Sequence, residues 1–253
     1  MIKFFRHIRK SLLMENKTSK YFKYAIGEII LVVIGILIAL QINNWNEKRK
    51  SKVAVKIALE SLISDLKKDT LQLREDLGYI DQDHNRLKDF RLRLSHPLAT
   101  IDSARRIARY EYSPFFDPSN TLNRNTITSL LSTGRIDDFD QDLKNKILTH
   151  NAEQIKGLRI MDQNVSIYLN NQTKYSDIVT VQSENSRLDD YVVRGPLLDQ
   201  YWKNKSDKEI LDTMLTMITA KSLMYLIIGE YKRSIKDKTE DMINYLESYL
   251  DEY

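Results

Sequence analysis

Histidine and acidic side chains are the residues in this sequence that could bind a metal ion or transfer protons. The four histidines lie in separate segments: His7, His84, His96 and His150. Only His84 has an acid at helical spacing, Asp81, three residues before it. One such pair falls short of the convergent ligand set that a metal site needs. We therefore assign no metal-ligating residue and expect no cofactor.

Paired acids are also a weak signal here. Asp137 with Asp138, and Asp189 with Asp190, are adjacent, but a chain with 35 acidic residues is expected to carry such pairs on helix caps and surfaces. Glycine-rich phosphate loops and the G-x-S-x-G and H-E-x-x-H motifs are absent from the sequence. No catalytic or cofactor-binding residue is assigned, and the sequence predicts a protein that is not an enzyme.

The composition indicates which elements must position any site. Seven glycines and four prolines in 253 residues are few for a sheet protein with many tight turns, so we predict an all-α fold. The absence of cysteine excludes disulfides and thiolate metal sites.

Charge is unevenly distributed along the chain. Residues 1–56 hold twelve Lys/Arg and three acids, a net charge of +9, whereas the remainder carries −5 and has no basic stripe. Nucleic acid is therefore not expected as a partner. The basic end flanks an apolar segment, which makes the lipid bilayer the first predicted partner.

The apolar segment is long enough to span a bilayer. Tyr24 to Ile42 would form a helix of about 28 Å, at roughly 1.5 Å per residue. Its twelve Ile, Leu and Val residues favour insertion by about 4–7 kcal/mol, whereas Glu28 costs at most about 3 kcal/mol. No small-x-small cleavage site follows, which favours an uncleaved anchor over a signal peptide. We predict a transmembrane helix over 24–45.

Flanking charges predict the orientation of this span. Seven Lys/Arg precede it and five follow closely, so the N-terminus is expected in the cytoplasm. Residues 1–23 are predicted to form a basic amphipathic helix in the headgroup layer, because Ile2, Phe5, Ile8 and Leu12 fall on one side of it. Residues 46–253 would then form a domain outside the cytoplasm, in the periplasm if the cell has two membranes, and the protein would cross its membrane once.

Glu28 shares one face of the predicted span with Val32, Gly35 and Ala39. Gly35 and Ala39 have the small-xxx-small spacing that lets another helix approach closely. We identify these four residues as a candidate transmembrane packing face. The alternative is that Glu28 reaches the nearby headgroups and that the small residues are apolar filler.

A long helix is predicted after the anchor. Apolar residues recur there at intervals of seven: Leu59, Leu66, Leu73, Ile80, Leu87 and Leu94. The same register carries the acids Asp69, Asp76 and Asp83, so the seam is half polar and makes a poor stand-alone coiled coil. We therefore predict packing within the chain, in an antiparallel long-helix bundle, in preference to a parallel dimer.

A proline-bounded stretch, YEYSPFFDPSN, concentrates aromatic residues. Pro114, Phe115 and Phe116 form a candidate interaction loop. The alternative is that these aromatics plug the end of the bundle.

Two helices are predicted after this loop. Residues 126–133 form a short one with Gly134 at its C-terminal cap. Asp137 or Asp138 is expected to cap the next, which runs toward Asn170.

The last third of the chain shows two patterns. Residues 172–198 have no steady period and predict an irregular connection. Ser206 and Glu209 form a capping box, S-x-x-E, which opens a helix expected to run to about Leu250.

Two stretches resemble a known family. The first fifty residues, from MIKFFRHIRKSLL to QINNWNEKRK, are similar to the N-terminus of a family of uncharacterised single-span membrane proteins from Bacteroidetes-type bacteria. YSPFFDPSNTLNRNTITSLLSTGRIDDFDQDLKNKIL resembles that family's central pattern of a Pro-Phe turn, a short helix and a long helix. Because these bacteria have two membranes, the resemblance implies a location in a bacterial inner membrane, with a helical soluble part in the periplasm. It implies no catalytic residues.

These observations favour a scaffold or interaction subunit of a membrane complex, with a protein partner or self-association. The alternative is a sensor whose bundle binds a small molecule. A sensor usually needs an output domain across the membrane, and the cytoplasmic side would hold only Met1 to Lys23, which ranks the sensor second.

Overall fold

The computed structural model describes residues 18–116, 121–179 and 194–252, and every regular element in these ranges is a helix. This confirms the all-α class. The elements are α2 (Thr18–Leu94), α3 (Ile101–Arg106), the π-helix η1 (Ile107–Glu111), α4 (Asn125–Ser132), the 3₁₀ helix η2 (Arg135–Asp138), α5 (Gln141–Lys174), α6 (Ser176–Val179), α7 (Pro196–Asn204) and α8 (Asp207–Glu252).

The chain divides into two compact units, residues 1–57 and 58–253. The described part of the first unit is the beginning of α2, on which the large apolar side chains from Ile26 to Ile42 are exposed all around the helix. Most of the predicted amphipathic segment, 1–23, lies outside the described residues. The expected boundaries at 23/24 and 45/46 stay predictions.

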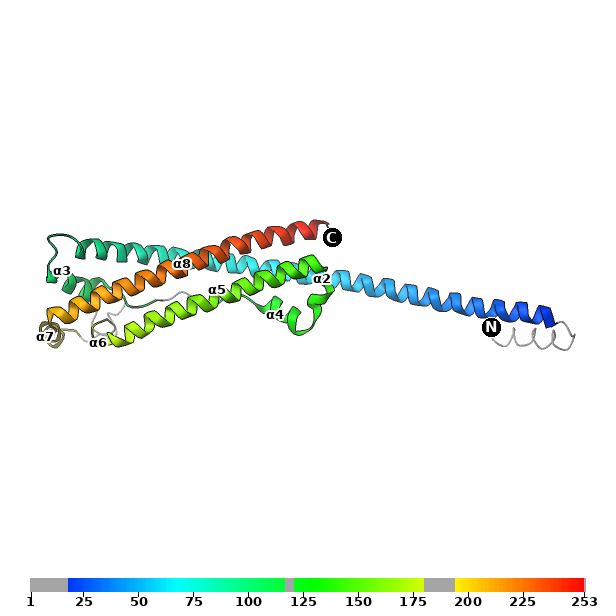
Figure 1. The fold of residues 1–253 in the computed structure, drawn as a ribbon, viewed down its shortest axis with the longest axis horizontal. Coiled ribbons are helices and arrows are strands. Elements are labelled where there is room, and N and C mark those ends of the chain that lie inside the picture. The colour runs from blue at the N-terminus through cyan, green and yellow to red at the C-terminus, as the bar shows by residue number, and fades with distance from the viewer. Residues whose placement is uncertain (1–17, 117–120, 180–193, 253) are drawn as a thin grey trace. The chain divides into compact units, whose positions relative to one another are not determined.

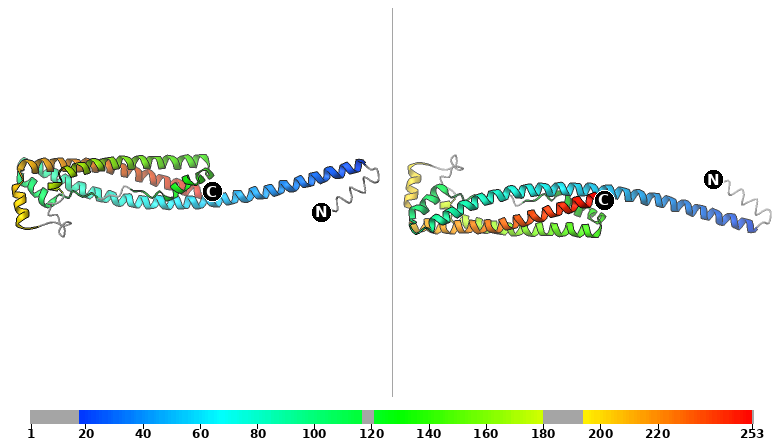
Figure 2. Two further views of the ribbon diagram at one scale, coloured as in Figure 1. Left: turned by 90° about the horizontal axis from the view of Figure 1, so that it is seen from below. Right: turned by 90° about the horizontal axis from the view of Figure 1, so that it is seen from above.

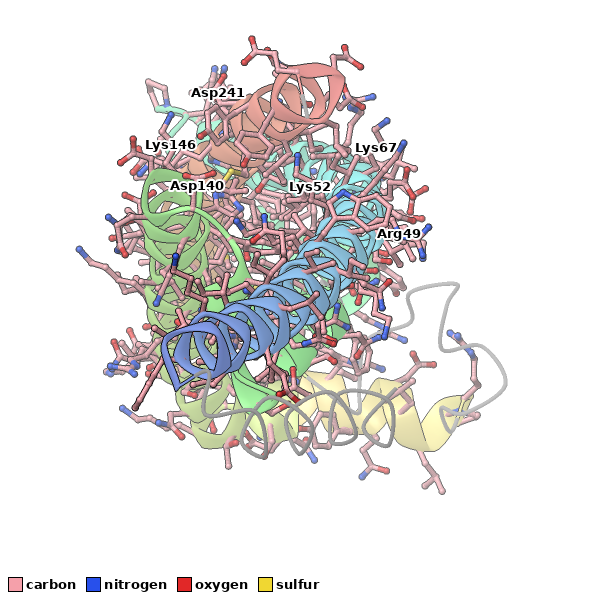
Figure 3. All side chains as sticks on the ribbon, turned by 90° about the vertical axis from the view of Figure 1, so that its right-hand side faces the viewer. Arg49, Lys52, Lys67, Asp140, Lys146 and Asp241 are labelled. Atoms are coloured by element: carbon pink, nitrogen blue, oxygen red, sulfur yellow. The ribbon has the colours of Figure 1, made fainter. Side chains whose placement is uncertain are left out.

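The second unit is a bundle in which α2, α5 and α8 lie side by side, as the views in Figures 1 and 2 agree. Five of the apolar residues predicted at intervals of seven on α2 are less than 5% exposed: Leu59, Leu66, Leu73, Ile80 and Leu87. Charged side chains such as Lys67, Lys146 and Asp241 lie on the outside of this unit (Figure 3). The bundle therefore has the buried seam and charged surface expected of a helical core.

Heptad-spaced pairs fix the antiparallel register of α2 and α8. Exposed ion pairs join Lys67 to Glu247 at 2.6 Å, Arg74 to Glu240 at 3.1 Å and Asp81 to Arg233 at 2.7 Å. Each step moves seven residues forward on α2 and seven backward on α8. Pairs of this kind contribute about 0–1 kcal/mol each, so they specify the register more than they stabilise the fold.

A glycine allows α5 and α8 to pack closely. A β-carbon at Gly157 would lie 2.6 Å from Cδ1 and 3.3 Å from Cγ1 of Ile235 on α8, both closer than ordinary van der Waals contact. The side chain of Ile235 therefore fills the space that any other residue at 157 would need.

The helix caps between α4 and α5 differ in part from expectation. Gly134 has φ of 72°, as expected for the residue that ends α4. The prediction that Asp137 or Asp138 caps the following helix is wrong. Both lie in η2, and Asp140 is the N-cap of α5, where its carboxylate accepts the backbone N–H of Leu143 at 2.9 Å.

The capping box predicted at the beginning of the last helix, α8, is confirmed. Glu209 accepts the backbone N–H of Ser206 at 2.8 Å, and the Ser206 hydroxyl accepts the N–H of Glu209 at 3.2 Å. The prediction of an irregular connection over 172–198 is wrong at both ends, because α6 and the beginning of α7 lie within that range. Pro196, at the first turn of α7, is the start signal that sequence reasoning missed.

Candidate functional site

Two lysines on α8 lie inside the bundle. Lys221 and Lys232 are 0% and 1% exposed, although lysine is almost never fully buried unless it is paired. Each faces one of the acids that interrupt the apolar seam of α2. The acids that make the predicted seam of α2 half polar therefore include the buried partners of these lysines.

Lys221 joins α8 to α2 and to the segment after η1. Its Nζ donates to the backbone oxygens of Ser113 at 2.7 Å and Phe115 at 2.9 Å, and lies 2.7 Å from Oδ2 of Asp83. These three acceptors match the three donors of an ammonium group. Aromatic rings of Tyr112 and Tyr225 lie 5.7 and 5.5 Å from the same nitrogen and add cation–π stabilisation.

Three tyrosine hydroxyls extend this network. Tyr225 donates to Oδ2 of Asp83 at 2.6 Å, and Tyr168 donates to the backbone oxygen of Pro114 at 2.5 Å. The hydroxyls of Tyr112 and Tyr168 lie 3.2 Å apart. Burial raises the pKa of all three phenols, and the charge of Asp83 raises that of Tyr225 further. The phenols therefore stay neutral hydrogen-bond donors at physiological pH.

A hollow of about 270 Å³ opens beside Asp83. Besides Asp83 and Tyr225, its walls are formed by Tyr79, Gln82, Arg86, Ser113 and Phe115. Arg86 lies 3.9 Å from Asp83 and remains about half exposed. The hollow thus combines a charge-neutralised carboxylate with a guanidinium at its edge, an arrangement suited to a small polar ligand.

Lys232 makes the more deeply buried pair. Its Nζ lies 2.6 Å from Oδ2 of Asp76, and the two side chains are 1% and 4% exposed. The other carboxylate oxygen, Oδ1, accepts the side-chain amide of Gln72 at 2.9 Å. Such a pair contributes little net stability but is costly to break.

Two further acids of α2 hold the beginning of α4. Asp65 accepts the backbone N–H of Thr126 at 3.1 Å and its hydroxyl at 2.6 Å, and also the side-chain amide of Asn123 at 2.9 Å. Asp69 accepts the backbone N–H of Asn123 at 2.6 Å. Arg124, the N-cap residue of α4, makes no side-chain cap of its own. Asp65 therefore caps α4 from a different helix.

Asp69 differs from Asp76 and Asp83 because no lysine pairs with it. Its Oδ2 has no hydrogen-bond partner among the described residues, and the matching heptad position on α8 is Thr239, whose hydroxyl donates to the backbone oxygen of Ile235. Burial, and to a smaller extent the charge of Asp65, raises the pKa of Asp69 from 3.8 to about 6, although the hydrogen bond from Asn123 lowers it.

The Asp69→Asn substitution should change how stability depends on pH. The folded protein holds the Asp69 proton more tightly than the unfolded chain, so this residue makes stability fall as the pH rises from about 4 to about 6. Asparagine keeps the acceptor for Asn123 and has no charge to bury. We expect the variant to gain melting temperature over the native protein at pH 7.5 and to show a smaller difference at pH 4.5. If the difference in melting temperature between the variant and the native protein were the same at every pH in this range, the raised pKa of Asp69 would be contradicted.

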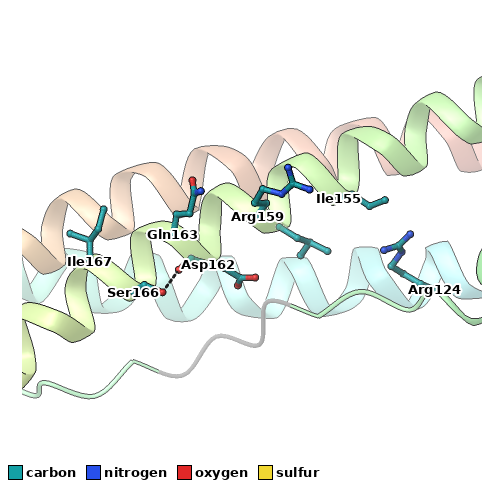
Figure 4. Close-up of a pocket in the computed structure, with 8 residues that line it drawn as sticks. Arg124, Ile155, Arg159, Asp162, Gln163, Ser166 and Ile167 are labelled. Carbon is teal, nitrogen blue, oxygen red and sulfur yellow. Dashed lines mark hydrogen bonds between the residues drawn. The ribbon is translucent and has the colours of Figure 1, made fainter.

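A separate hollow of about 730 Å³ lies between α5 and Arg124, on the segment before α4 (Figure 4). Its lining is Arg124, Ile155, Leu158, Arg159, Asp162, Gln163, Ser166 and Ile167. The Ser166 hydroxyl donates to the backbone oxygen of Asp162 at 2.9 Å, an ordinary bond within a helix turn. No residue of the Lys221 network lines this hollow, so the two features are independent.

The candidate interaction loop lies against the buried network. Pro114 is buried, and its backbone oxygen and those of its neighbours accept from Tyr168 and Lys221. Phe116 packs on Tyr225 with ring centroids 5.5 Å apart, whereas Phe115 is about half exposed. The segment therefore covers part of the bundle and leaves one aromatic ring at the surface. Whether it binds a partner stays a prediction.

The other residues singled out in the sequence, on the span and at Asp81, are not part of the buried lysine sites. Around Gly35, on the predicted packing face with Glu28, Val32 and Ala39, nothing lies within 4 Å of where a β-carbon would be. Asp81 accepts a hydrogen bond from Arg233 at 2.7 Å. Across the described ranges, no three His, Asp or Glu side chains are grouped as metal ligands.

Sequence reasoning missed both buried lysines. The available signal for Lys221 was that it interrupts an otherwise apolar part of α8 while acids interrupt the facing seam of α2. Lys232 lies in a charged stretch of α8, where its sequence neighbours do not mark it. Pairing them requires the register of the two helices, which the sequence leaves open.

Comparison with known proteins adds one finding. Residues 28–96 match the model of a family of unknown function, DUF6090. The matched stretch begins at Glu28 and includes Asp76 and Asp83, so this chain is similar to that family over the apolar segment and the acid-bearing part of α2. No curated protein and no solved structure matches the chain. The expected bacterial group and single-span topology stay predictions.

Proposed function

We propose that this chain is anchored in a membrane by one helical span within residues 24–45 and presents its bundle as a scaffold or interaction subunit of a membrane complex. One observation carries the anchor. None of the residues in the most apolar 18-residue window near the beginning of α2 is buried, although nearly every side chain in it is hydrophobic. Exposed in water, such a helix would be unfavourable by several kcal/mol.

Two helices in the described ranges are long and apolar enough to cross a membrane. The second, α8, has half of its apolar window buried in the bundle and contains the paired Lys221. We therefore interpret α8 as a core helix and the beginning of α2 as the span.

The absence of cysteine permits a direct test of topology. We expect Ser11→Cys to be protected from a membrane-impermeant maleimide in intact spheroplasts, and Asn204→Cys, on an exposed residue of α7, to be labelled. The seven-to-five excess of Lys/Arg before the span places the N-terminus inside. Labelling of Ser11→Cys alone would invert the orientation, and loss of the native chain from the membrane fraction after carbonate washing would refute the anchor.

The packing face of the span gives a second prediction. Gly35→Ile and Glu28→Gln should each weaken association in membranes, because one removes the close approach and the other removes an ionisable group from the same face. Ile30→Leu is the matched control, since it lies on another side of the helix. A two-helix reporter should show reduced signal for the first two variants. Equal signal from all three would leave the segment as an anchor alone.

The sensor alternative is favoured by the polar hollow beside Asp83. A pull-down from native membranes in mild detergent, followed by native mass spectrometry, separates the two functions. A protein complex supports the scaffold, and a bound small molecule supports the sensor. In neither role do we assign catalysis to the chain.

A further inference from the structure

The outward face of α8 is apolar although it faces solvent. Leu211, Leu215, Leu223 and Leu226 are each 40–54% exposed. Between Asp212 and Glu230 the single charged residue is Lys221, which is buried. The surface of this helix therefore presents no charge over about 25 Å, at roughly 1.5 Å per residue.

The residues of this face are arranged symmetrically about Thr219. At about 100° per residue, Leu215 and Leu223 lie about 40° to either side of Thr219, and Lys208 and Glu230 about 20° to either side. Lys208 and Glu230 are each eleven residues from Thr219 and have opposite charges. A rotation that reverses the helix about Thr219 therefore exchanges leucine with leucine and lysine with glutamate.

We propose that this face, defined by Lys208, Leu215, Thr219, Leu223 and Glu230, binds the same face of a second copy in antiparallel orientation. Thr219 lies at the twofold axis, where a small residue lets the helices approach. Leu215 of each copy packs on Leu223 of the other, and Lys208 pairs with Glu230. A twofold contact uses one self-complementary patch, which this face provides.

The charged residues at the ends of this face favour a second copy of the chain as the partner, with the two α8 helices antiparallel. A parallel pair would place Glu230 against Glu230 and Asp212 against Asp212, with like charges in contact. In the antiparallel pair, Asp212 lies opposite Leu226, but it already accepts a hydrogen bond from Lys208 of its own chain at 2.5 Å. The twofold axis runs across α8 at Thr219. Two copies can therefore share one membrane when α8 lies parallel to the membrane surface and the axis lies along the membrane normal.

Disulfide cross-linking of the full chain in native membranes tests the register. Under mild oxidation, Thr219→Cys should form a homodimer, because residues at a twofold axis come within the Cα separation of about 4.4–6.8 Å that a disulfide needs. Leu215→Cys and Leu223→Cys should cross-link with each other when coexpressed under two tags and only weakly with themselves. Self-linking at both leucine positions would show a parallel pair and overturn the proposal.

Affinity gives the second readout. Leu223→Asp should raise the dimer Kd of the detergent-solubilised chain by about 30-fold or more, as expected for a charge at the centre of an interface. Leu71→Asp is the matched control, since Leu71 is exposed to a similar degree on α2 and should leave the Kd unchanged. Glu230→Lys should weaken the dimer about fivefold, and Lys208→Glu should restore it.

The inference rests on the proposed interaction role but can fail separately from it. A native chain that stays in the membrane fraction and is monomeric throughout overturns the self-association and leaves the anchor intact. Protection of Thr219→Cys from thiol reagents by the bilayer, without cross-linking, would assign the face to lipid and also overturn the proposal.

Discussion

Replacing Lys232 by methionine should lower the free energy of unfolding by about 3–5 kcal/mol, because it leaves Asp76 as an uncompensated charge inside the bundle. Nearly the whole side chain of Asp76 is buried, and Gln72 satisfies only one of its oxygens. Chemical denaturation followed by circular dichroism measures the loss. If the pair specifies the register of the helices and adds little net stability, the double variant Asp76→Leu with Lys232→Met should recover most of the lost free energy of unfolding.

Lys238 provides the matched control for this experiment. It also lies on α8 and forms an ion pair, with Glu153 at 2.7 Å, but both side chains are about half exposed. Lys238→Met should therefore cost no more than about 1 kcal/mol. A similar cost for the two lysine variants would show that burial does not distinguish the pairs.

Lys221→Met should destabilise the bundle by a comparable amount, about 3–5 kcal/mol, and should also act locally. Methionine leaves Asp83 with only the half-exposed Arg86, at 3.9 Å, as a cation, and removes the lysine donor from the backbone oxygens of Ser113 and Phe115. Hydrogen exchange monitored by mass spectrometry should show faster exchange at residues 107–116 than the global loss of stability explains.

Lys236→Met is the control for the local effect, because Lys236 pairs with Asp237 and Glu240 at the surface of α8. It should leave exchange at residues 107–116 unchanged. If Lys221→Met speeds exchange evenly over the whole bundle, Lys221 contributes to global stability and does not specifically hold this segment.

Local signals explain what could be predicted from the sequence. The seven-residue apolar spacing, the capping box at Ser206 and the glycine after α4 each act within a few turns of the chain, so a single stretch contains the information. The cap of α5 failed because three acids compete within four residues, and η2 removes Asp137 and Asp138 from the position that Asp140 takes.

The buried network depends on contacts between distant segments. Asp83 and Lys221 are 138 residues apart in the sequence, and the oxygens that complete the coordination of Lys221 belong to the backbone, which carries no residue-specific signal. The three acids of the seam look alike in sequence. Two meet lysines and the third, Asp69, meets none, and only the register of α2 against α8 distinguishes them.

The close approach of α5 and α8 at Gly157 has a consequence for how this chain can evolve. Because the end of the Ile235 side chain occupies the volume that a β-carbon at 157 would need, a larger residue at 157 requires that side chain to move or to become shorter. Change can pass through Ile235 first, since a shorter side chain there opens room that alanine at 157 could then fill. The two sites should therefore drift as a linked pair among descendants of this sequence, and the order of substitution should run from α8 to α5.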